Sequence, residues 1–271
     1  MTVNKTDYDG SPAHRPRPSR TSQVVAAVRS GLTRPTTPGG DGTAQEQLCA
    51  GMVRSELPGP LIVHLTARTR CVDAQVLDAI AGGVEQVVVL GAGYDDRALR
   101  FRSPGVRYFE VDHPDTQADK ARRLGALGDA AAEIDLVPAD FRTDDVAAVL
   151  EGSGHDAGRP TLFVAEGLIV YLDPTAIVAL LSGLHRRAST GSTLVATLAV
   201  HAAGLDSAAV AAYANAGRAN AATEPWRTIL PLPLHVDLLA RAGWSAAACL
   251  DDTAFDPVAV PDRSVTVVAV P

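Results

Sequence analysis

The chain has 271 residues, 46% of them hydrophobic and 20% charged, a balance typical of a folded globular protein with a full core. The formal net charge of −7 argues against a broad phosphate-binding surface and so against nucleic acid as a partner. The sequence shows no apolar run near the roughly 18 residues that span a bilayer and no signal-peptide core, so we expect a cytoplasmic protein without membrane association.

The cysteines Cys49, Cys71 and Cys249 are odd in number and far apart. They have no metal-binding or redox spacing, so we expect small buried side chains in a reducing compartment and no metal site.

The polar, proline-dotted residues 1–20 predict a disordered tail, with a basic docking arm as the alternative. Residues 21–271 are predicted to form a single domain. Its first part, 21–80, is expected to be a helical cap. Three helices are predicted there, one capped by Ser22 and running to Arg29, and two over 45–54 and 61–80.

Two arginines, Arg68 and Arg70, lie in the helix predicted over 61–80. At 3.6 residues per turn they are about 200° apart around the axis, so both cannot easily face one pocket. The functional interpretation is a bidentate clamp for a carboxylate, and the alternative is an ordinary solvated surface arginine. Their spacing does not separate the two interpretations.

The most informative stretch is the apolar run 86–90, which predicts a strand buried on both faces, followed by Gly91-Ala92-Gly93. Glycines at this point allow a tight turn and the close approach of a ligand. A second predicted strand ends at Asp112, 21 residues after Gly91. Nucleotide-binding βαβ units place their ribose-binding acid at about this distance. The alternative is a glycine turn that binds nothing.

The identity of the nucleotide depends on Asp95 and Asp96. Asp96 occupies the position of the third glycine in the dinucleotide fingerprint, which argues against an NAD-dependent oxidoreductase. Two carboxylates at a helix start would repel a pyrophosphate but would tolerate a sulfonium and an ammonium group. This pattern favours S-adenosylmethionine, whose ribose Asp112 would bind.

Two further strands are predicted to end on acidic residues at the sheet edge where α/β proteins bind ligands. The strand over 134–138 leads to Asp140 and Phe141, which could contact an adenine amino group and ring. Asp140 could instead be a turn acid, although Asp144 is the expected cap of the following helix. The strand over 161–165 ends at Glu166.

The remaining elements favour a parallel sheet with helices on both faces. A helix begins at Asp173-Pro174 and a strand covers 192–200. Residues 201–233 are too long for a plain connection and predict a helical lid insertion, in which Trp226 lines a substrate pocket or anchors the core. After a short helix, the last two strands, 244–250 and 264–270, are expected as an antiparallel pair at the sheet edge.

Five motifs in this order resemble the leucine carboxyl methyltransferase family: Arg68-Thr-Arg70, Leu90-Gly-Ala-Gly-Tyr-Asp-Asp-Arg97, Phe109-Glu-Val-Asp-His-Pro114, Ala165-Glu-Gly-Leu-Ile-Val-Tyr-Leu172 and Glu224-Pro-Trp-Arg227. The resemblance covers about residues 20–271. It implies a class I methyltransferase fold, an α/β, doubly wound, mostly parallel seven-stranded sheet with an antiparallel last strand. It also implies S-adenosylmethionine as methyl donor. The chain departs from the usual family pattern at Asp96, where threonine is common, and at Thr228-Ile229, where Phe-Gly is common.

The resemblance also implies roles for individual residues. Arg68, with Arg70 as the fallback, would pair with the cofactor carboxylate, and Glu166 would stand near its amino group and the methyl centre. Asp112 would hold the ribose, and Asp140 with Phe141 the adenine. The other implied cofactor contacts are Gly91, Ala92, Gly93, Asp95 and His113. Tyr171 would position the reactants, and Trp226 and Arg227 would line the substrate pocket.

Together these observations predict an O-methyltransferase, a monomer or homodimer, that acts on a carboxylate of a small secondary metabolite. A carboxylate is already ionised at neutral pH and needs no general base. A phenol or enol acceptor is the alternative, and it would need a base such as His64, His113 or His201. A catalytically silent relative that only binds the cofactor is the third reading.

Overall fold

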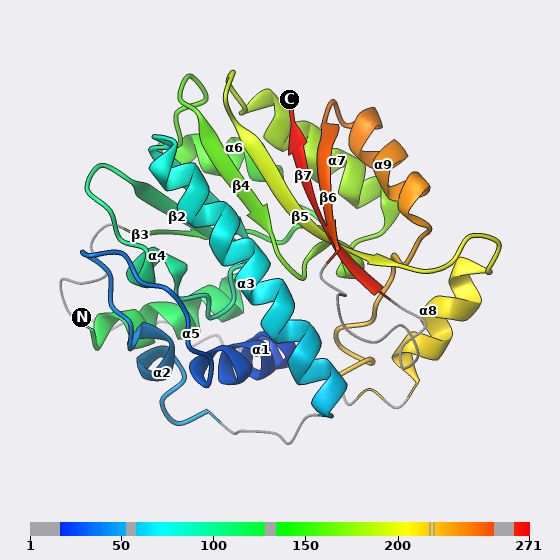
Figure 1. Cartoon of the computed structure of the whole chain (residues 1–271), viewed down its shortest axis with the longest axis horizontal. Coiled ribbons are helices and arrows are strands. Elements are labelled where there is room, and N and C mark those ends of the chain that lie inside the picture. Colours follow the sequence, from blue (N-terminus) through cyan, green and yellow to red (C-terminus); the bar gives the residue numbers. More distant parts are fainter. Residues whose placement is uncertain (1–16, 53–57, 128–133, 217, 219, 252–262) are drawn as a thin grey trace, which may run out of the picture.

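The computed structural model describes residues 17–52, 58–127, 134–216, 218, 220–251 and 263–271. Its centre is a seven-stranded sheet of order β3-β2-β1-β4-β5-β7-β6 (Figure 1). The strands are β1 (Gln86–Leu90), β2 (Arg107–Asp112), β3 (Ile134–Pro138), β4 (Thr161–Ala165), β5 (Thr193–Val200), β6 (Ser245–Asp251) and β7 (Arg263–Val270). The predicted α/β class and seven strands are confirmed.

Most neighbouring strands are parallel, and the exception is the last one. β1 pairs in parallel with both β2 and β4, with Val89 opposite Glu110 on one side and Val164 on the other. β7 runs antiparallel to β5 and to β6, between which it lies. The antiparallel pair is therefore confirmed. The pair forms one edge of the sheet, with β6 as the outermost strand and β7 between β5 and β6.

Helices cover both faces of the sheet, as a doubly wound fold requires. They are α1 (Arg20–Ser30), α2 (Ala44–Leu48), α3 (Gly59–Ala81), α4 (Arg97–Arg100), α5 (Pro114–Gly125), α6 (Val146–Gly152), α7 (Pro174–Arg186), α8 (Ser207–Asn215) and α9 (Leu232–Arg241). A 3-10 turn covers Ile169–Tyr171. None of these helices is both long enough and apolar enough to cross a bilayer.

The side-chain pattern of each element explains its layer. Val72 and Val76, four positions apart on α3, pack with Val87 and Val89 on one face of the sheet, which α3 crosses in Figure 1. The opposite face of the sheet packs against α6, α7 and α9 in the largest core cluster. Side chains along β1 point alternately to the two faces of the sheet, and both faces are covered, so β1 is buried throughout.

Two helix starts differ from the sequence predictions. α1 begins one turn early, because Ser19 rather than Ser22 caps it by accepting the Ser22 N–H. Asp145, not Asp144, caps α6. Asp144 instead accepts the backbone N–H of Asp140 over 2.9 Å and so supports that strand-end turn.

The described end of the predicted tail contacts the domain. The Arg17 N–H donates to Asp115 over 3.0 Å and the Ser19 N–H donates to the Thr116 hydroxyl over 3.2 Å, both at the start of α5. Residues 1–16 lie outside the described residues. The expectation of three buried cysteines is correct only for Cys49, since Cys71 is half-buried and Cys249, on the edge strand β6, is exposed.

The predicted lid insertion contains α8 and a series of turns. α8 buries none of its residues and lies at the periphery in Figure 1. Further along, the segment returns to the domain, where the Arg227 N–H donates to Val170 O over 2.7 Å and the Thr228 hydroxyl donates to Leu172 O over 2.5 Å. These bonds hold the end of the insertion against the turn that follows β4.

Candidate cofactor-binding and active site

A cavity of about 440 Å³ opens at the carboxyl ends of β1, β2 and β4, the edge at which parallel α/β sheets bind ligands. Helices α1 and α3, together with Arg218, Glu224 and Trp226 from the segment 201–233, complete its wall. Most residues predicted for the site line this cavity, namely Arg68, Gly91, Ala92, Asp95, Asp112, His113, Asp140, Phe141, Glu166, Tyr171 and Trp226. Arg70, Gly93 and Arg227 are not part of its lining.

The glycine loop packs directly against α1. Gly93 has a φ of +51°, and a Cβ there would lie 2.6 Å from the Cβ of Ser22. The position therefore requires glycine for its conformation and for its space. The Gly93 N–H donates to Asp112 Oδ2 over 2.6 Å, so Gly93 positions the acid rather than lining the cavity.

Asp112 lies at the end of β2 with both carboxylate oxygens directed by backbone groups. Oδ2 accepts from Gly93, and Oδ1 accepts the His113 N–H over 2.7 Å. Burial raises the pKa of Asp112, although these two N–H groups act in the opposite direction. Since a carboxylate has about four lone-pair sites, each oxygen retains capacity for a ribose hydroxyl.

Asp140 and Phe141 lie beside Asp112 at the end of β3. Asp140 accepts from the backbone N–H of Arg142 over 3.0 Å and pairs with the Arg142 guanidinium over 3.0 Å. It is therefore a turn acid and a cavity residue at once. Phe141 is partly buried and packs against the main core cluster.

Glu166, at the tip of β4, is bound by arginines from three different elements. Its oxygens lie 2.7 Å from Arg29 Nη2 of α1, 2.7 Å from Arg97 Nη1 of α4, and 2.9 Å from Arg68 Nε of α3. Burial alone would raise the pKa of Glu166, but the three guanidinium charges outweigh it and hold the pKa well below its usual value. Glu166 is consequently a firmly ionised carboxylate.

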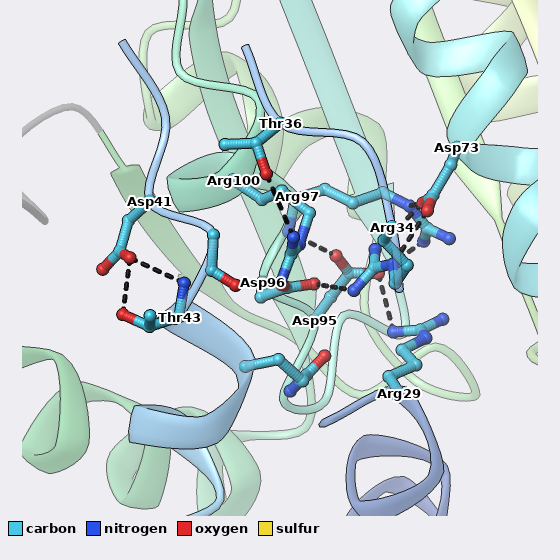
Figure 2. A network of polar contacts seen from close by, with 12 residues as sticks. Arg29, Arg34, Thr36, Asp41, Thr43, Asp73, Asp95, Asp96, Arg97 and Arg100 are labelled. Carbon is cyan, nitrogen blue, oxygen red and sulfur yellow. Dashed lines mark hydrogen bonds and ion pairs between the residues drawn. The ribbon is translucent and has the colours of Figure 1, made fainter. Parts of the chain in front are cut away.

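Two of these arginines, Arg29 and Arg97, also belong to the buried network shown in Figure 2. Asp95 pairs with Arg29 over 3.0 Å and with Arg97 over 2.6 Å. Burial raises its pKa, but Arg97 and Arg29 together lower it to about 2. Asp96 pairs with Arg34 and Arg100, each over 2.6 Å.

This network overturns the electrostatic argument that the sequence suggested. Asp96 is fully buried among arginines and does not line the cavity, and the charge of Asp95 is compensated. The loop therefore does not present two unpaired carboxylates to a ligand. Among the described residues, the cavity-lining carboxylates outside this arginine network are those of Asp112, Asp140 and Glu224.

Sequence reasoning missed Arg29, Arg34 and Asp73. Asp73 is 1% exposed, binds Arg34 through both oxygens and also accepts from Arg97 over 2.7 Å. A signal was available, because Asp73 falls in the buried stripe of α3 between Val72 and Val76. A charged residue within an apolar stripe requires a buried partner.

The two candidate clamp arginines are separated by the geometry of α3. Arg68 lines the cavity and donates through Nε to Glu166, whereas Arg70 is exposed. Within the described residues, no acceptor bonds to the terminal nitrogens of Arg68. These nitrogens pass within 3.4 Å of where a Cβ of Gly167 would lie, so glycine there allows their approach.

The opposite wall of the cavity comes from α1, α3 and the insertion. It includes Trp226 and, unpredicted, Arg218 and Glu224. Of the three candidate base histidines, His64 and His113 line the cavity. His201 lies 6% exposed, with its ring nitrogens near Ala202 O and the Ser207 hydroxyl. In the described part of the chain, no group of acidic, histidine or cysteine side chains is arranged to hold a metal ion.

The strand order and the inserted antiparallel strand define a class I methyltransferase-like fold. The chain is similar in structure to a "putative methyltransferase" from Thermobifida fusca. Their alignment covers 91% of this chain and 93% of that protein, with a TM-score of 0.58 and 16% sequence identity. Magnesium protoporphyrin IX methyltransferase from Synechocystis, solved with bound S-adenosylhomocysteine, covers 84% of this chain and 94% of its own length with a TM-score of 0.54 and 11% identity. At these identities the likeness establishes the fold alone.

Sequence comparison gives the family. The sequence profile of leucine carboxyl methyltransferase matches residues 34–185, more than half of the chain. The chain belongs to the leucine carboxyl methyltransferase family.

Curated relatives share one name, "Putative S-adenosyl-L-methionine-dependent methyltransferase". One from Mycolicibacterium paratuberculosis is 38% identical over 169 residues, which are 60% of this chain and 51% of the relative. Another from Frankia alni is 35% identical over 188 residues, 68% of this chain and 62% of the relative. The chain thus spans about half the length of the first of these relatives.

Proposed function

We propose that the protein is an S-adenosylmethionine-dependent O-methyltransferase that methylates a carboxylate of a small metabolite. One observation carries the proposal. In a member of this family, the strand-end cavity brings together Asp112, the terminal nitrogens of Arg68 and the carboxylate of Glu166. These groups match, in that order, a ribose, a carboxylate and an ammonium group. The first N–H of α4, at Arg97, donates to Asp95 Oδ1 over 2.8 Å and is therefore not free for a pyrophosphate.

In this proposal, each of these cavity residues contacts one part of the cofactor. Arg68 holds the methionine carboxylate through its terminal nitrogens, while Glu166 accepts from the amino group. Asp112 binds the ribose hydroxyls, and Asp140 and Phe141 bind the adenine. Gly91 and Ala92 allow close approach, and His113 flanks the nucleoside. Bound S-adenosylmethionine would supply an electrophilic methyl group on a sulfonium.

Gly93 and Asp95 support this set indirectly. Gly93 orients Asp112 through its N–H, and Asp95 fixes Arg29 and Arg97, which in turn hold Glu166. Residues 21–80 form the cap and 201–233 the lid in this proposal. Both contribute to the wall that keeps water from the reacting atoms.

The candidate general bases in the cavity are weak, which favours a carboxylate acceptor over a phenol or enol. Burial and the nearby Arg68 charge lower the pKa of His64 to about 4, so it accepts a proton poorly at neutral pH. Glu166 is also a poor base, because the three guanidinium charges hold its pKa well below its usual value. The Nδ1 of His113 accepts the Asp115 backbone N–H over 3.3 Å and caps α5. A carboxylate acceptor needs only positioning against the methyl group, a task to which Tyr171 contributes.

The first test is calorimetry with S-adenosylhomocysteine. We expect one site per chain, and no heat at millimolar ligand would refute the proposal. A labelled methyl donor incubated with extracts and carboxylic acid panels should then yield a methyl ester. A transfer rate that rises with pH toward the pKa of a base would instead indicate a phenol or enol. Tight binding without any transfer would identify a silent relative.

A further inference from the structure

The part of the cavity wall that faces away from the strands contains an arginine without an acidic partner. Arg218 lines the cavity, and no described carboxylate pairs with it. Its Nη1 donates to the side-chain oxygen of Asn215 over 3.1 Å. By contrast, Arg29, Arg68 and Arg97 on the cofactor side all bind Glu166. A half-buried cation that a neutral amide holds in place is suited to an anionic ligand.

Arg218 is held against Trp226. The guanidinium carbon lies 4.2 Å from the centre of the indole ring, within cation–π range. Asn215 hydrogen-bonds to both residues. Besides accepting from Arg218, its Oδ1 accepts the Trp226 N–H over 3.0 Å, and its Nδ2 donates to Trp226 O over 2.9 Å. The two side chains therefore form one preorganised unit, which reduces the entropy lost on binding a ligand.

The indole nitrogen of Trp226 does not face the cavity. Nε1 is buried and has no hydrogen-bond partner within the described residues, whereas the ring lines the cavity. Trp226 therefore contributes the ring against which the Arg218 guanidinium lies, and not a hydrogen bond to a ligand.

Apart from one carboxylate, the lining that α1, α3 and the segment 201–233 add to the cavity near its apolar side is uncharged. Val24 and Val25 of α1 and Leu61 and Leu65 of α3 line the same cavity as the pair. His64 is uncharged at neutral pH because of its lowered pKa. The nearby carboxylate, Glu224, already accepts both the N–H and the hydroxyl of Thr21.

We infer that Arg218, held by Asn215 against the ring of Trp226, forms a recognition site for an anionic oxygen of the methyl acceptor, whose body is apolar. The inference rests on the proposed function and names its substrate class. The recognised oxygen is one that does not attack the methyl group, because a guanidinium bound to the attacking oxygen would reduce its nucleophilicity. Arg218, rather than the predicted Arg227, is thus the residue that selects the acceptor.

The test uses the full chain saturated with S-adenosylhomocysteine and two matched pairs of probes: phenylacetate with phenylacetamide, and biphenyl-4-carboxylate with its amide. Calorimetry compares wild type with Arg218→Gln, Trp226→Phe and the neighbouring Arg227→Gln as control. We expect wild type to prefer at least one carboxylate over its amide by about tenfold, the worth of a charge-assisted hydrogen bond.

Arg218→Gln should abolish that preference by weakening the carboxylate, while the amide changes less than about twofold. Trp226→Phe keeps a ring but one that attracts the guanidinium less than an indole does, so it should weaken the carboxylate by less than Arg218→Gln does. Arg227→Gln should change neither probe. Equal affinity for carboxylate and amide in wild type, no binding of any probe at millimolar concentration, or equal losses in Arg218→Gln and Arg227→Gln would overturn the inference. Loss of S-adenosylhomocysteine binding in wild type would refute the proposed function instead.

Discussion

Thr21 and Glu224 are 203 positions apart in the chain, and yet they form a direct bridge over the cavity. The Thr21 N–H donates to Glu224 Oε2 over 3.1 Å, and the Thr21 hydroxyl donates to the same oxygen. Both residues line the cavity, one from the start of α1 and the other from the end of the lid insertion. Two hydrogen bonds to one carboxylate oxygen therefore join the start of α1 to the segment 201–233.

Glu224→Ala should weaken the attachment of the start of α1 to the segment that contains Glu224 and Trp226. A hydrogen bond to a charged acceptor contributes roughly 1.5–3 kcal/mol, and less where water competes. We expect faster amide hydrogen exchange in α1 and around Trp226, and about three- to tenfold weaker S-adenosylhomocysteine binding. Glu151→Ala, which changes a carboxylate on α6 that is 74% exposed, is the matched control and should leave both unchanged. Unaltered exchange in Glu224→Ala would show that the bridge does not hold the two segments together.

Asp112→Asn should weaken S-adenosylhomocysteine binding by about ten- to a hundredfold, because the ribose loses a charged acceptor worth roughly 1.5–3 kcal/mol. The fold should persist, since the asparagine oxygen can still accept one of the two backbone N–H groups of Gly93 and His113. Calorimetry measures the affinity and a thermal melt the fold. Asp135→Asn, on β3 and paired with Arg107, is the control. An unchanged affinity in Asp112→Asn would show that Asp112 does not bind the ribose.

Arg97→Met should strongly destabilise the protein. Its guanidinium is fully buried and lies within 2.7 Å of Asp73, Asp95 and Glu166. Removing one partner of a buried ion pair costs about 3–5 kcal/mol because the remaining charges stay uncompensated. For a chain of this size we expect the melting temperature to fall by about 10 °C or more.

The control for Arg97→Met is an arginine in an exposed pair. Arg159 lies 2.6 Å from Glu85, with both side chains more than half exposed. Arg159→Met should change stability by less than about 1 kcal/mol, because water and salt screen such pairs. Similar melting temperatures for the two variants would contradict a stabilising role for the buried network.

Glu110 predicts a pH dependence of stability. Burial raises its pKa from 4.5 to about 7, against the opposing charge of Lys120. The folded protein therefore retains a proton between these pH values that the unfolded chain has lost. The contribution of Glu110 to stability is fully present below about pH 4.5 and is lost as the pH rises through 7.

Melting curves between pH 5 and 8 test this, with Glu110→Gln as the reference that carries no titrating group. Wild type should lose stability relative to Glu110→Gln as the pH rises through this range. Asp95 does not interfere, because its lowered pKa of about 2 affects stability only in acid. Parallel curves for the two proteins would show that Glu110 does not titrate there.

Local sequence determined the central strands and the position of the nucleoside acid. β1 and β4 have the bounds that their continuous apolar runs predict, because a strand buried on both faces must be apolar throughout. Asp112 reaches the cavity because the spacing from Gly91 is set by one strand–helix–strand unit. The choice between Arg68 and Arg70 required the orientation of α3, although their angular separation already showed that only one could serve.

Only the tertiary structure decided the electrostatics of the site and the place of the last strand. Asp95 and Asp96 are neutralised by Arg29 and Arg34, which lie 66 and 62 positions away in the chain. The predicted pair of last strands forms the sheet edge, but the order within it, with β7 beside β5 and β6 outermost, followed only from the structure. The hydrophobic periodicity of a segment indicates which of its side chains are buried, and it depends only on residues close in sequence. The partner of a buried charge or of an edge strand lies in a segment distant in sequence, so it is known only when the folded chain brings the two segments together.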